Sequence, residues 1–231
     1  MVAKSPINQA ERDKLIDYLF QFITPERKNR FEKIIQYRTR FLTVVLEDIF
    51  QSHNISAVLR SCDCFGVQDV HIIENKNQFQ INPDIALGAS KWLTLHQHNK
   101  SENNTLSCIK ALKAEGYRII STSPHKNDIN LEELDITQKT ALLFGTELNG
   151  ISETAAKHAD GFVKIPMVGF TESFNISVSV ALCLFNLTDK IRKSNVNWKI
   201  SENEKSEIML EWLRNTIQSS EAIEKKFYTT N

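Results

Sequence analysis

Three segments of this chain place polar residues where an apolar, strand-like run gives way to a helix-like run. They are N-I-S-A-V-L-R from Asn54, L-L-F-G-T-E-L-N-G from Leu142 and I-P-M-V-G-F-T-E-S-F-N-I-S-V-S-V-A from Ile165. In open α/β sheets, ligands bind at the carboxyl edge of the strands. Three such junctions therefore predict one composite site on an α/β sheet, and they favour an enzyme over a simple binding domain.

Hydrophobic periodicity supports a parallel sheet flanked by helices. Residues 42–47 form a continuous apolar run typical of a buried strand, and a helical stripe begins near Asn54 and stops at Gly66. A second strand over 69–74 completes a βαβ unit, which implies parallel pairing. Further strands are expected at 117–122, 140–145 and 162–165, and further helices at 103–115, 152–158 and 176–192.

Helices are also expected at both ends of the chain. Apolar spacing predicts a helix over 9–22, Thr24-Pro25 predicts the start of another that runs to about residue 36, and 204–227 reads as one amphipathic helix. We therefore divide the chain into an N-terminal helical, basic extension (1–40), a catalytic α/β domain (41–193) and a C-terminal helical extension (194–231).

Composition excludes several classes of protein. The chain holds 28 basic and 28 acidic residues, and neither a signal peptide nor a membrane span is evident. Its four cysteines fit reduced thiols in a cytoplasmic protein. No phosphate-binding glycine loop occurs, and His96-x-His98 has no convincingly spaced partner, so no metal is expected.

Each polar motif residue has a structural interpretation beside a functional one. Asn54 could cap a helix, and Arg60 lies off the apolar stripe, as surface arginines do. Glu147 could accept hydrogen bonds from a ribose or an amine, or it could charge the start of the next helix. Of Ser173 and Asn175, one could cap the long helix while the other points into the cleft.

Basic residues gather between residues 27 and 40. Phosphate binding would explain this cluster, although a solvated helix face is the simpler interpretation. With the segment 190–193, it is the candidate surface for a nucleic-acid backbone: Arg27, Lys28, Arg30, Arg38, Arg40, Lys190, Arg192 and Lys193.

Together the three motifs resemble those of the SpoU/TrmH family, within the SPOUT RNA 2′-O-ribose methyltransferases. The match spans roughly 38–192, and its third motif, Ile165 to Ser179, is the most specific. The short N-terminus and the run Gly88 to Leu93 are most similar to the tRNA-modifying members. The resemblance implies a C-terminal deep trefoil knot, a homodimer, tRNA as partner and S-adenosylmethionine as cofactor, with guanosine 18 of the D-loop as the expected target.

The resemblance also assigns roles to residues. It implies a catalytic set of Arg60, Asn54, Glu147, Ser173 and Asn175, and a cofactor frame of Phe144, Gly145, Ile165, Met167 and Phe174. Guanidinium has a pKa above about 12, so Arg60 is a poor general base. We prefer a role in gripping phosphate and stabilising the developing alkoxide, with direct proton acceptance by Arg60 as the alternative.

Other functions stay open at this point. The same chemistry could act on ribosomal RNA or at another tRNA position. The chain could also be an inactive RNA-binding paralogue or a small-molecule methyltransferase. The intact set of polar motif residues argues against an inactive paralogue, and the basic cluster argues against a small-molecule methyltransferase.

Overall fold

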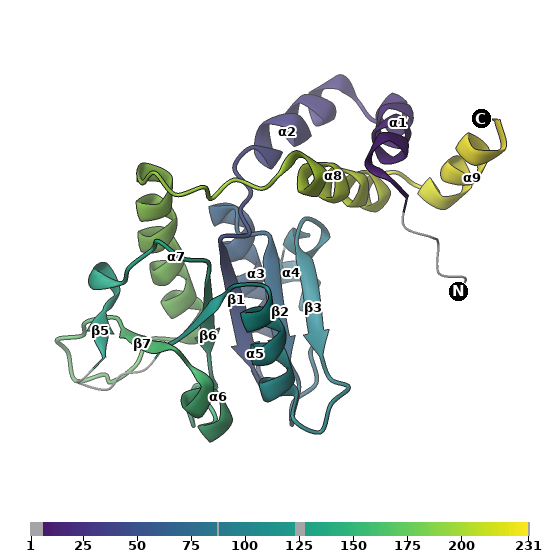
Figure 1. The fold of residues 1–231 in the computed structure, drawn as a ribbon. Coiled ribbons are helices and arrows are strands. Elements are labelled where there is room, and N and C mark those ends of the chain that lie inside the picture. The colour runs from purple at the N-terminus through teal and green to yellow at the C-terminus, as the bar shows by residue number, and fades with distance from the viewer. Residues whose placement is uncertain (1–6, 87, 123–127, 231) are drawn as a thin grey trace. The chain divides into compact units, whose positions relative to one another are not determined.

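The computed structural model describes residues 7–86, 88–122 and 128–230 and divides them into two units (Figure 1). The sheet unit runs from Thr39 to Trp198. The helical unit combines the described residues up to Arg38 with those from Lys199 onward. The described parts of the two helical extensions, which the sequence analysis named by their places in the chain, thus share one unit.

The sheet unit contains seven strands among its described residues. They are β1 (Leu42–Glu47), β2 (Asp69–Ile73), β3 (Thr94–His98), β4 (Arg118–Thr122), β5 (Ile129–Asn130), β6 (Thr140–Phe144) and β7 (Gly161–Lys164). Their order is β3-β2-β1-β6-β4-β7-β5, and every pair is parallel. The expected parallel α/β sheet is confirmed, while β3 and β5 were not predicted.

Helices cover both faces of this sheet (Figure 1). The longer ones are α3 (Ser52–Phe65), α5 (Asn104–Ala114), α6 (Glu153–His158) and α7 (Ile176–Lys193), and the short ones are α4 (Pro83–Ala86), η2 (Ala89–Lys91) and η3 (Leu131–Glu133). Helices α3 and α7 pack together on one face, and α5 and α6 cover the other.

Alternation along β1 explains the two apolar layers. Leu42, Val44 and Leu46 belong to the cluster under α3 and α7, whereas Val45 belongs to the cluster under α5 and α6. Successive side chains of a strand point to opposite faces, so a strand covered on both sides must be apolar throughout. This arrangement leaves the carboxyl ends of the strands for polar residues.

The helical unit contains α1 (Gln9–Leu19), η1 (Phe20–Phe22), α2 (Pro25–Ile35), α8 (Glu202–Thr216) and α9 (Ser220–Thr230). Thr24 caps α2 with Pro25 in its first turn, as predicted. The single helix expected over 204–227 is wrong, because the chain breaks at Ser219, whose φ is 59°. Across this break Arg214 pairs with the buried carboxylate of Glu224 at 2.8 Å, which holds α8 and α9 together.

Among the described residues, no helix is both long and apolar enough to cross a membrane.

Candidate functional site

A cavity of about 450 Å³ lies at the carboxyl ends of β4, β6 and β7. Its apolar wall includes Phe144, Ile165 and Met167, and its polar wall includes Thr122 and Ser173. All of these residues come from the sheet unit. The cavity therefore forms at the sheet edge where the second and third sequence motifs were expected to meet.

The second motif forms a tight loop after β6. Thr146 and Gly150 exchange two backbone hydrogen bonds of 2.9 Å, and Gly150 adopts a left-handed φ of 65°. A Cβ atom on Gly145 would collide with the carbonyl of Gly150, so only glycine fits there without a backbone shift. The loop places Glu147 on the cavity wall.

Asn54 joins the first motif to the other two. Its Nδ2 donates to Glu147 Oε1 and to Gln51 Oε1, and its Oδ1 accepts from Asn175 Nδ2 at 3.1 Å. The structural interpretation of Asn54 as a helix cap is wrong. Helix α3 begins at Ser52, so Asn54 lies inside its first turn, where a buried side chain can reach across to other elements.

The third motif divides its two polar residues as predicted. Asn175 is the N-cap of α7 and accepts from the backbone N–H of Ser177 at 2.9 Å, while Ser173 lines the cavity. Glu147 does not lie at the start of the following helix, because the N-cap of α6 is Ser152 and the acidic residue in its first turn is Glu153. The helix-charging interpretation of Glu147 therefore has no support in the structure.

Arg60 lies apart from this group. It is exposed on α3, does not line the cavity, and makes no hydrogen bond or ion pair with the described residues. Three of the five catalytic candidates, Asn54, Glu147 and Asn175, thus form one hydrogen-bonded network. Ser173 lines the cavity beside this network. Arg60 of the same chain lies outside both the network and the cavity wall.

The five residues expected to frame a cofactor all line the cavity: Phe144, Gly145, Ile165, Met167 and Phe174. The sequence analysis missed further wall residues, notably Thr122 and Thr146. Thr122 could have been found, because it ends a predicted strand at the same edge. Thr146 lies inside the second motif, but its backbone pairing with Gly150 is visible only in the fold.

The basic candidates of residues 27–40 fall into two groups. Arg27 and Arg30 are exposed on α2, and Lys28 lies half-buried over the ring of Phe20. The prediction that Arg38 contacts RNA is wrong. Only 2% of Arg38 is exposed, and its guanidinium packs on the ring of Trp212, so its role is in packing.

Arg40 forms an ion pair within the chain, because its guanidinium lies 2.9 Å from the carboxylate of Asp69.

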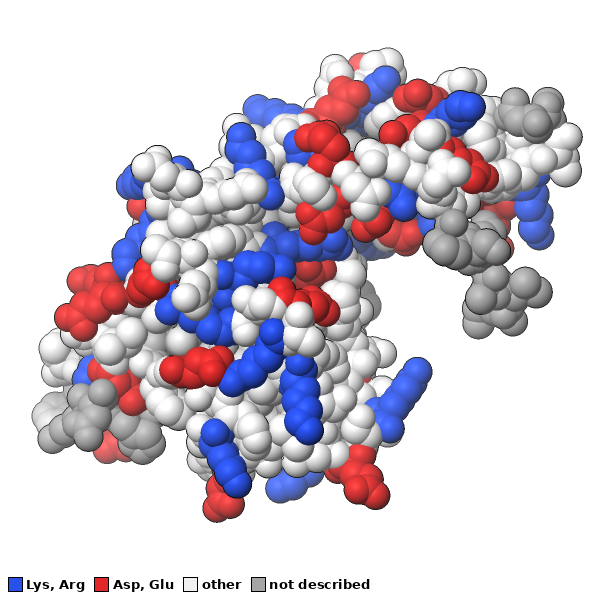
Figure 2. Space-filling view, viewed as in Figure 1, with Lys and Arg blue, Asp and Glu red and all other residues white. Residues whose placement is uncertain are grey.

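Figure 2 shows basic and acidic side chains interspersed on the visible face of the helical unit.

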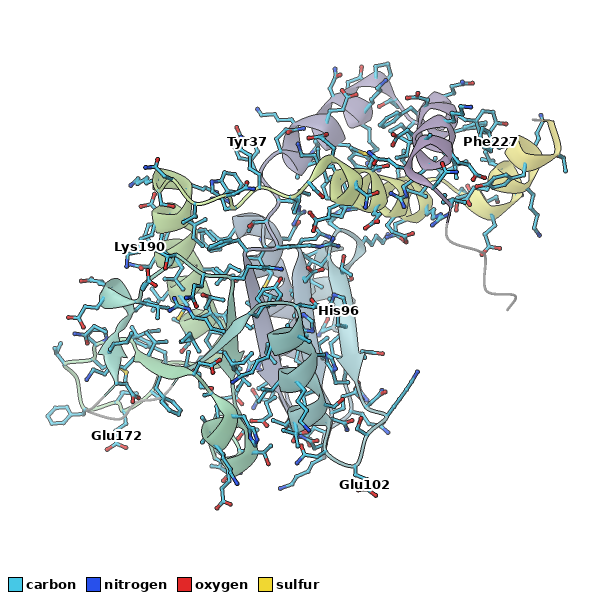
Figure 3. All side chains as sticks on the ribbon, viewed as in Figure 1. Tyr37, His96, Glu102, Glu172, Lys190 and Phe227 are labelled. Carbon is cyan, nitrogen blue, oxygen red and sulfur yellow. The ribbon has the colours of Figure 1, made fainter. Side chains whose placement is uncertain are left out.

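The basic residues at the end of α7 also have partners within the chain. Lys190, labelled in Figure 3, donates to the carbonyl oxygens of Glu132 and Leu134. Arg192 donates to the carbonyl of Phe65 at 2.6 Å, and Lys193 pairs with Asp189 at 2.7 Å. Of the three, Arg192 and Lys193 are exposed, and a phosphate would compete with these contacts.

The parallel α/β fold and the site formed by the three motifs define a protein of the SpoU methyltransferase class, and comparison with known families agrees. The model of the SpoU rRNA Methylase family matches residues 41–185, and the chain belongs to this family. It is 46% identical over 211 residues to the tRNA (guanosine(18)-2′-O)-methyltransferase of Borreliella burgdorferi, covering 91% of this chain and 95% of that protein. The Thermus thermophilus protein of the same name is 32% identical, covering 83% and 97%.

Solved structures agree with the fold. The Aquifex aeolicus TrmH/SpoU tRNA modifying enzyme superposes with a TM-score of 0.73 at 29% identity, covering 84% of this chain and 98% of that one. The SpoU methyltransferase AviRb from Streptomyces viridochromogenes, solved in complex with AdoMet, superposes with a TM-score of 0.60 at 24% identity, covering 70% and 65%.

Proposed function

We propose that this protein transfers a methyl group from S-adenosylmethionine to the ribose 2′-OH of guanosine 18 in the D-loop of tRNA. The observation that carries the proposal is the 46% identity, over 91% of the chain, to the Borreliella burgdorferi protein of that name. Proteins from Thermus thermophilus and Escherichia coli with the same name support it at 32% and 30% identity.

The cavity suits a nucleoside-containing cofactor. Its volume of about 450 Å³ lies within the usual range for small-molecule sites. Apolar side chains such as Ile165 and Met167 can hold a purine, while Thr122 and Ser173 offer hydroxyl groups. When bound, S-adenosylmethionine supplies an electrophilic methyl group on a sulfonium.

The residues of the chain must then align the ribose oxygen and stabilise its developing charge. Asn54 fixes Glu147 and Asn175 at one rim of the cavity, so these polar groups are positioned before substrate arrives. Alignment of reacting groups contributes about 7–11 kcal/mol in favourable cases. We assign Arg60 to the substrate phosphate and the developing alkoxide, because a guanidinium stays charged and forks across two oxygens.

A second copy of the chain would bring Arg60 to the cavity. Helix α7 and Phe174, two residues before its start, carry an exposed apolar stripe: Phe174 (41% exposed), Val178 (43%), Leu182 (38%) and Phe185 (66%). Such a stripe on the surface of a helix is typical of a protein interface. We therefore propose a homodimer formed through α7, with each active site completed by Arg60 of the other subunit. The trefoil knot and a cytoplasmic location stay predictions.

Methyl transfer from labelled S-adenosylmethionine to unmodified tRNA, followed by nuclease mapping, tests the function. We expect label in one 2′-O-methylguanosine of the D-loop. The matched control is the same tRNA with 2′-deoxyguanosine at position 18, which should bind but accept no label.

Label in the deoxy control would show that another atom or nucleotide is methylated. Label in ribosomal RNA alone would keep the reaction and overturn the substrate. Cofactor binding without label in any RNA would overturn the proposed function.

A further inference from the structure

A cluster of metal-ligating side chains lies away from the cavity, on the face of the sheet covered by α5. Strand β3 pairs in parallel with β2, so that His71 stands beside His96, and Ile73 beside His98. Residues of like parity on paired strands share a face, and His71, His96 and His98 therefore point the same way. His96 marks this strand in Figure 3. Cys108 comes from α5, which packs over β2 and β3.

Three of these side chains converge. The ligand atoms of His71, His98 and Cys108 all lie within 4.8 Å of one another, and His71 Nδ1 is 3.1 Å from His98 Nε2. Tetrahedral zinc, with bonds of about 2.0–2.1 Å to nitrogen and 2.3 Å to sulfur, needs ligand atoms roughly 3.3–3.6 Å apart. The two nitrogens already stand near this separation, and the sulfur is within a small side-chain movement of it.

The surroundings of the three side chains limit their exposure to water. His71 and Cys108 are buried, and His98 is half-buried. Metal binding would displace the thiol proton of Cys108, which leaves to solvent. The ring of His96 stacks on His71 at 4.4 Å between centroids, and its Nε2 lies 3.3 Å from Asp69, which fixes the orientation of the imidazoles.

We propose that His71, His98 and Cys108 bind a zinc ion, with water as the fourth ligand. Two imidazoles and a thiolate form a ligand set that zinc accepts. None of the three residues lines the cavity, so the ion would lie outside the proposed methyl-transfer site. It would fasten β3, the edge strand of the sheet, to β2 and α5.

The test uses the untagged, full-length protein. After treatment with a chelator and reconstitution with ZnCl₂, metal content is measured by inductively coupled plasma mass spectrometry, and CoCl₂ is used as a spectroscopic probe. We expect about one zinc per chain, a cobalt spectrum with a thiolate charge-transfer band, and a thermal unfolding temperature that rises by several degrees on zinc addition.

Variants separate the proposed ligands from their neighbours. Cys108→Ser and His98→Gln should weaken zinc binding at least about tenfold and remove the thermal shift. The matched control is Cys183→Ser, because Cys183 is equally buried but belongs to α7, on the other face of the sheet. His96→Gln should retain the ion.

Several results would overturn the proposal. One is zinc well below one equivalent in the reconstituted protein. Another is a cobalt spectrum without the thiolate band. A third is equal zinc binding by the Cys108→Ser and Cys183→Ser variants. In any of these cases, the cluster is a hydrogen-bonded pair of histidines, His71 buried and His98 half-buried, beside an inert thiol.

Discussion

Asn54 carries the contacts that join the three sequence motifs. Replacing it with alanine removes the hydrogen bonds to Gln51, Glu147 and Asn175. We expect Asn54→Ala to lower the free energy of unfolding by about 1–3 kcal/mol, since a buried polar partner is lost. We expect turnover to fall at least about tenfold, because Glu147 and Asn175 are no longer held in place.

Urea unfolding and single-turnover methylation measure the two effects of Asn54→Ala. Ser61→Ala is the control, since Ser61 lies on the same helix and its hydroxyl donates to the carbonyl of Ala57 within that helix. Wild-type turnover by the Asn54→Ala enzyme would show that the network is structural only.

Gly145 is required by close approach of two backbone segments. In the Gly145→Ala variant the new methyl group would strike the carbonyl of Gly150. We expect a loss of about 1–3 kcal/mol in stability from this overpacking, and weaker cofactor binding by calorimetry, because the loop wall must move. Gly169→Ala is the control, because a Cβ there meets no atom closer than 4.0 Å. Equal stability of the two variants would contradict the close-approach argument.

At the scale of one residue, sequence identified the polar side chains of the site but not their directions. The motif pattern pointed to Asn54, Glu147 and Asn175. Their mutual hydrogen bonds depend on where α3 begins. The N-cap of α3 is Gln51, three residues before the predicted cap Asn54, so Asn54 becomes a bridging residue inside the helix. The burial of Arg38 against Trp212 could not be predicted from the sequence either, because the two residues lie far apart along the chain.

Helix α2 carries the exposed basic residues that we expect to contact tRNA backbone. Replacing Arg27 and Arg30 together with alanine should weaken tRNA binding and reduce the slope of log K against log salt by about 2, since each phosphate contact releases roughly one counterion. Filter binding between low and physiological salt measures this slope. Lys14→Ala is the matched control, an exposed cation on α1 of the same unit. An unchanged slope would exclude Arg27 and Arg30 from the interface.

Helix α7 should hold the dimer together. We expect Leu182→Glu and Phe185→Glu to produce monomers in sedimentation experiments, because a buried carboxylate in an apolar interface is costly. Tyr37→Glu is the control, a similarly exposed ring in the helical unit. Circular dichroism checks that each variant is folded. A wild-type monomer, or variants that remain dimeric, would contradict the assignment of this stripe.

At the scale of elements, a strong apolar pattern was sufficient to predict a strand or helix, and a weak apolar pattern was not. The strands β1, β2, β4, β6 and β7 were predicted because they are apolar runs bounded by turn residues. Strand β3 was not predicted, because its residues Thr94-Leu95-His96-Gln97-His98 are mostly polar. It can be polar because it lies at the sheet edge and pairs on one side only. The break between α8 and α9 was not predicted, because the helical spacing of apolar residues continues across it.

At the scale of the whole molecule, Arg60 should act across the dimer. A heterodimer of Arg60→Ala and Glu147→Ala chains, isolated by two affinity tags, would contain one intact site if Arg60 reaches the cavity of its partner. We expect about half of the wild-type turnover per dimer, because one of two symmetric sites survives. Each homodimeric variant supplies its own control. Background activity in the heterodimer would show that Arg60 acts within its own chain.

The sequence alone determined the class of this protein: a parallel α/β sheet, three motifs at the carboxyl ends of its strands, and the five residues expected to frame a cofactor in the cavity. Those features follow from local periodicity and from residue types at strand ends, which neighbouring residues encode. Only the tertiary structure decided that both chain ends share one unit, that Asn54 bridges Glu147 and Asn175, and that His71 and His98 meet Cys108. These are contacts between segments distant in sequence, and their geometry is fixed by packing rather than by any local pattern.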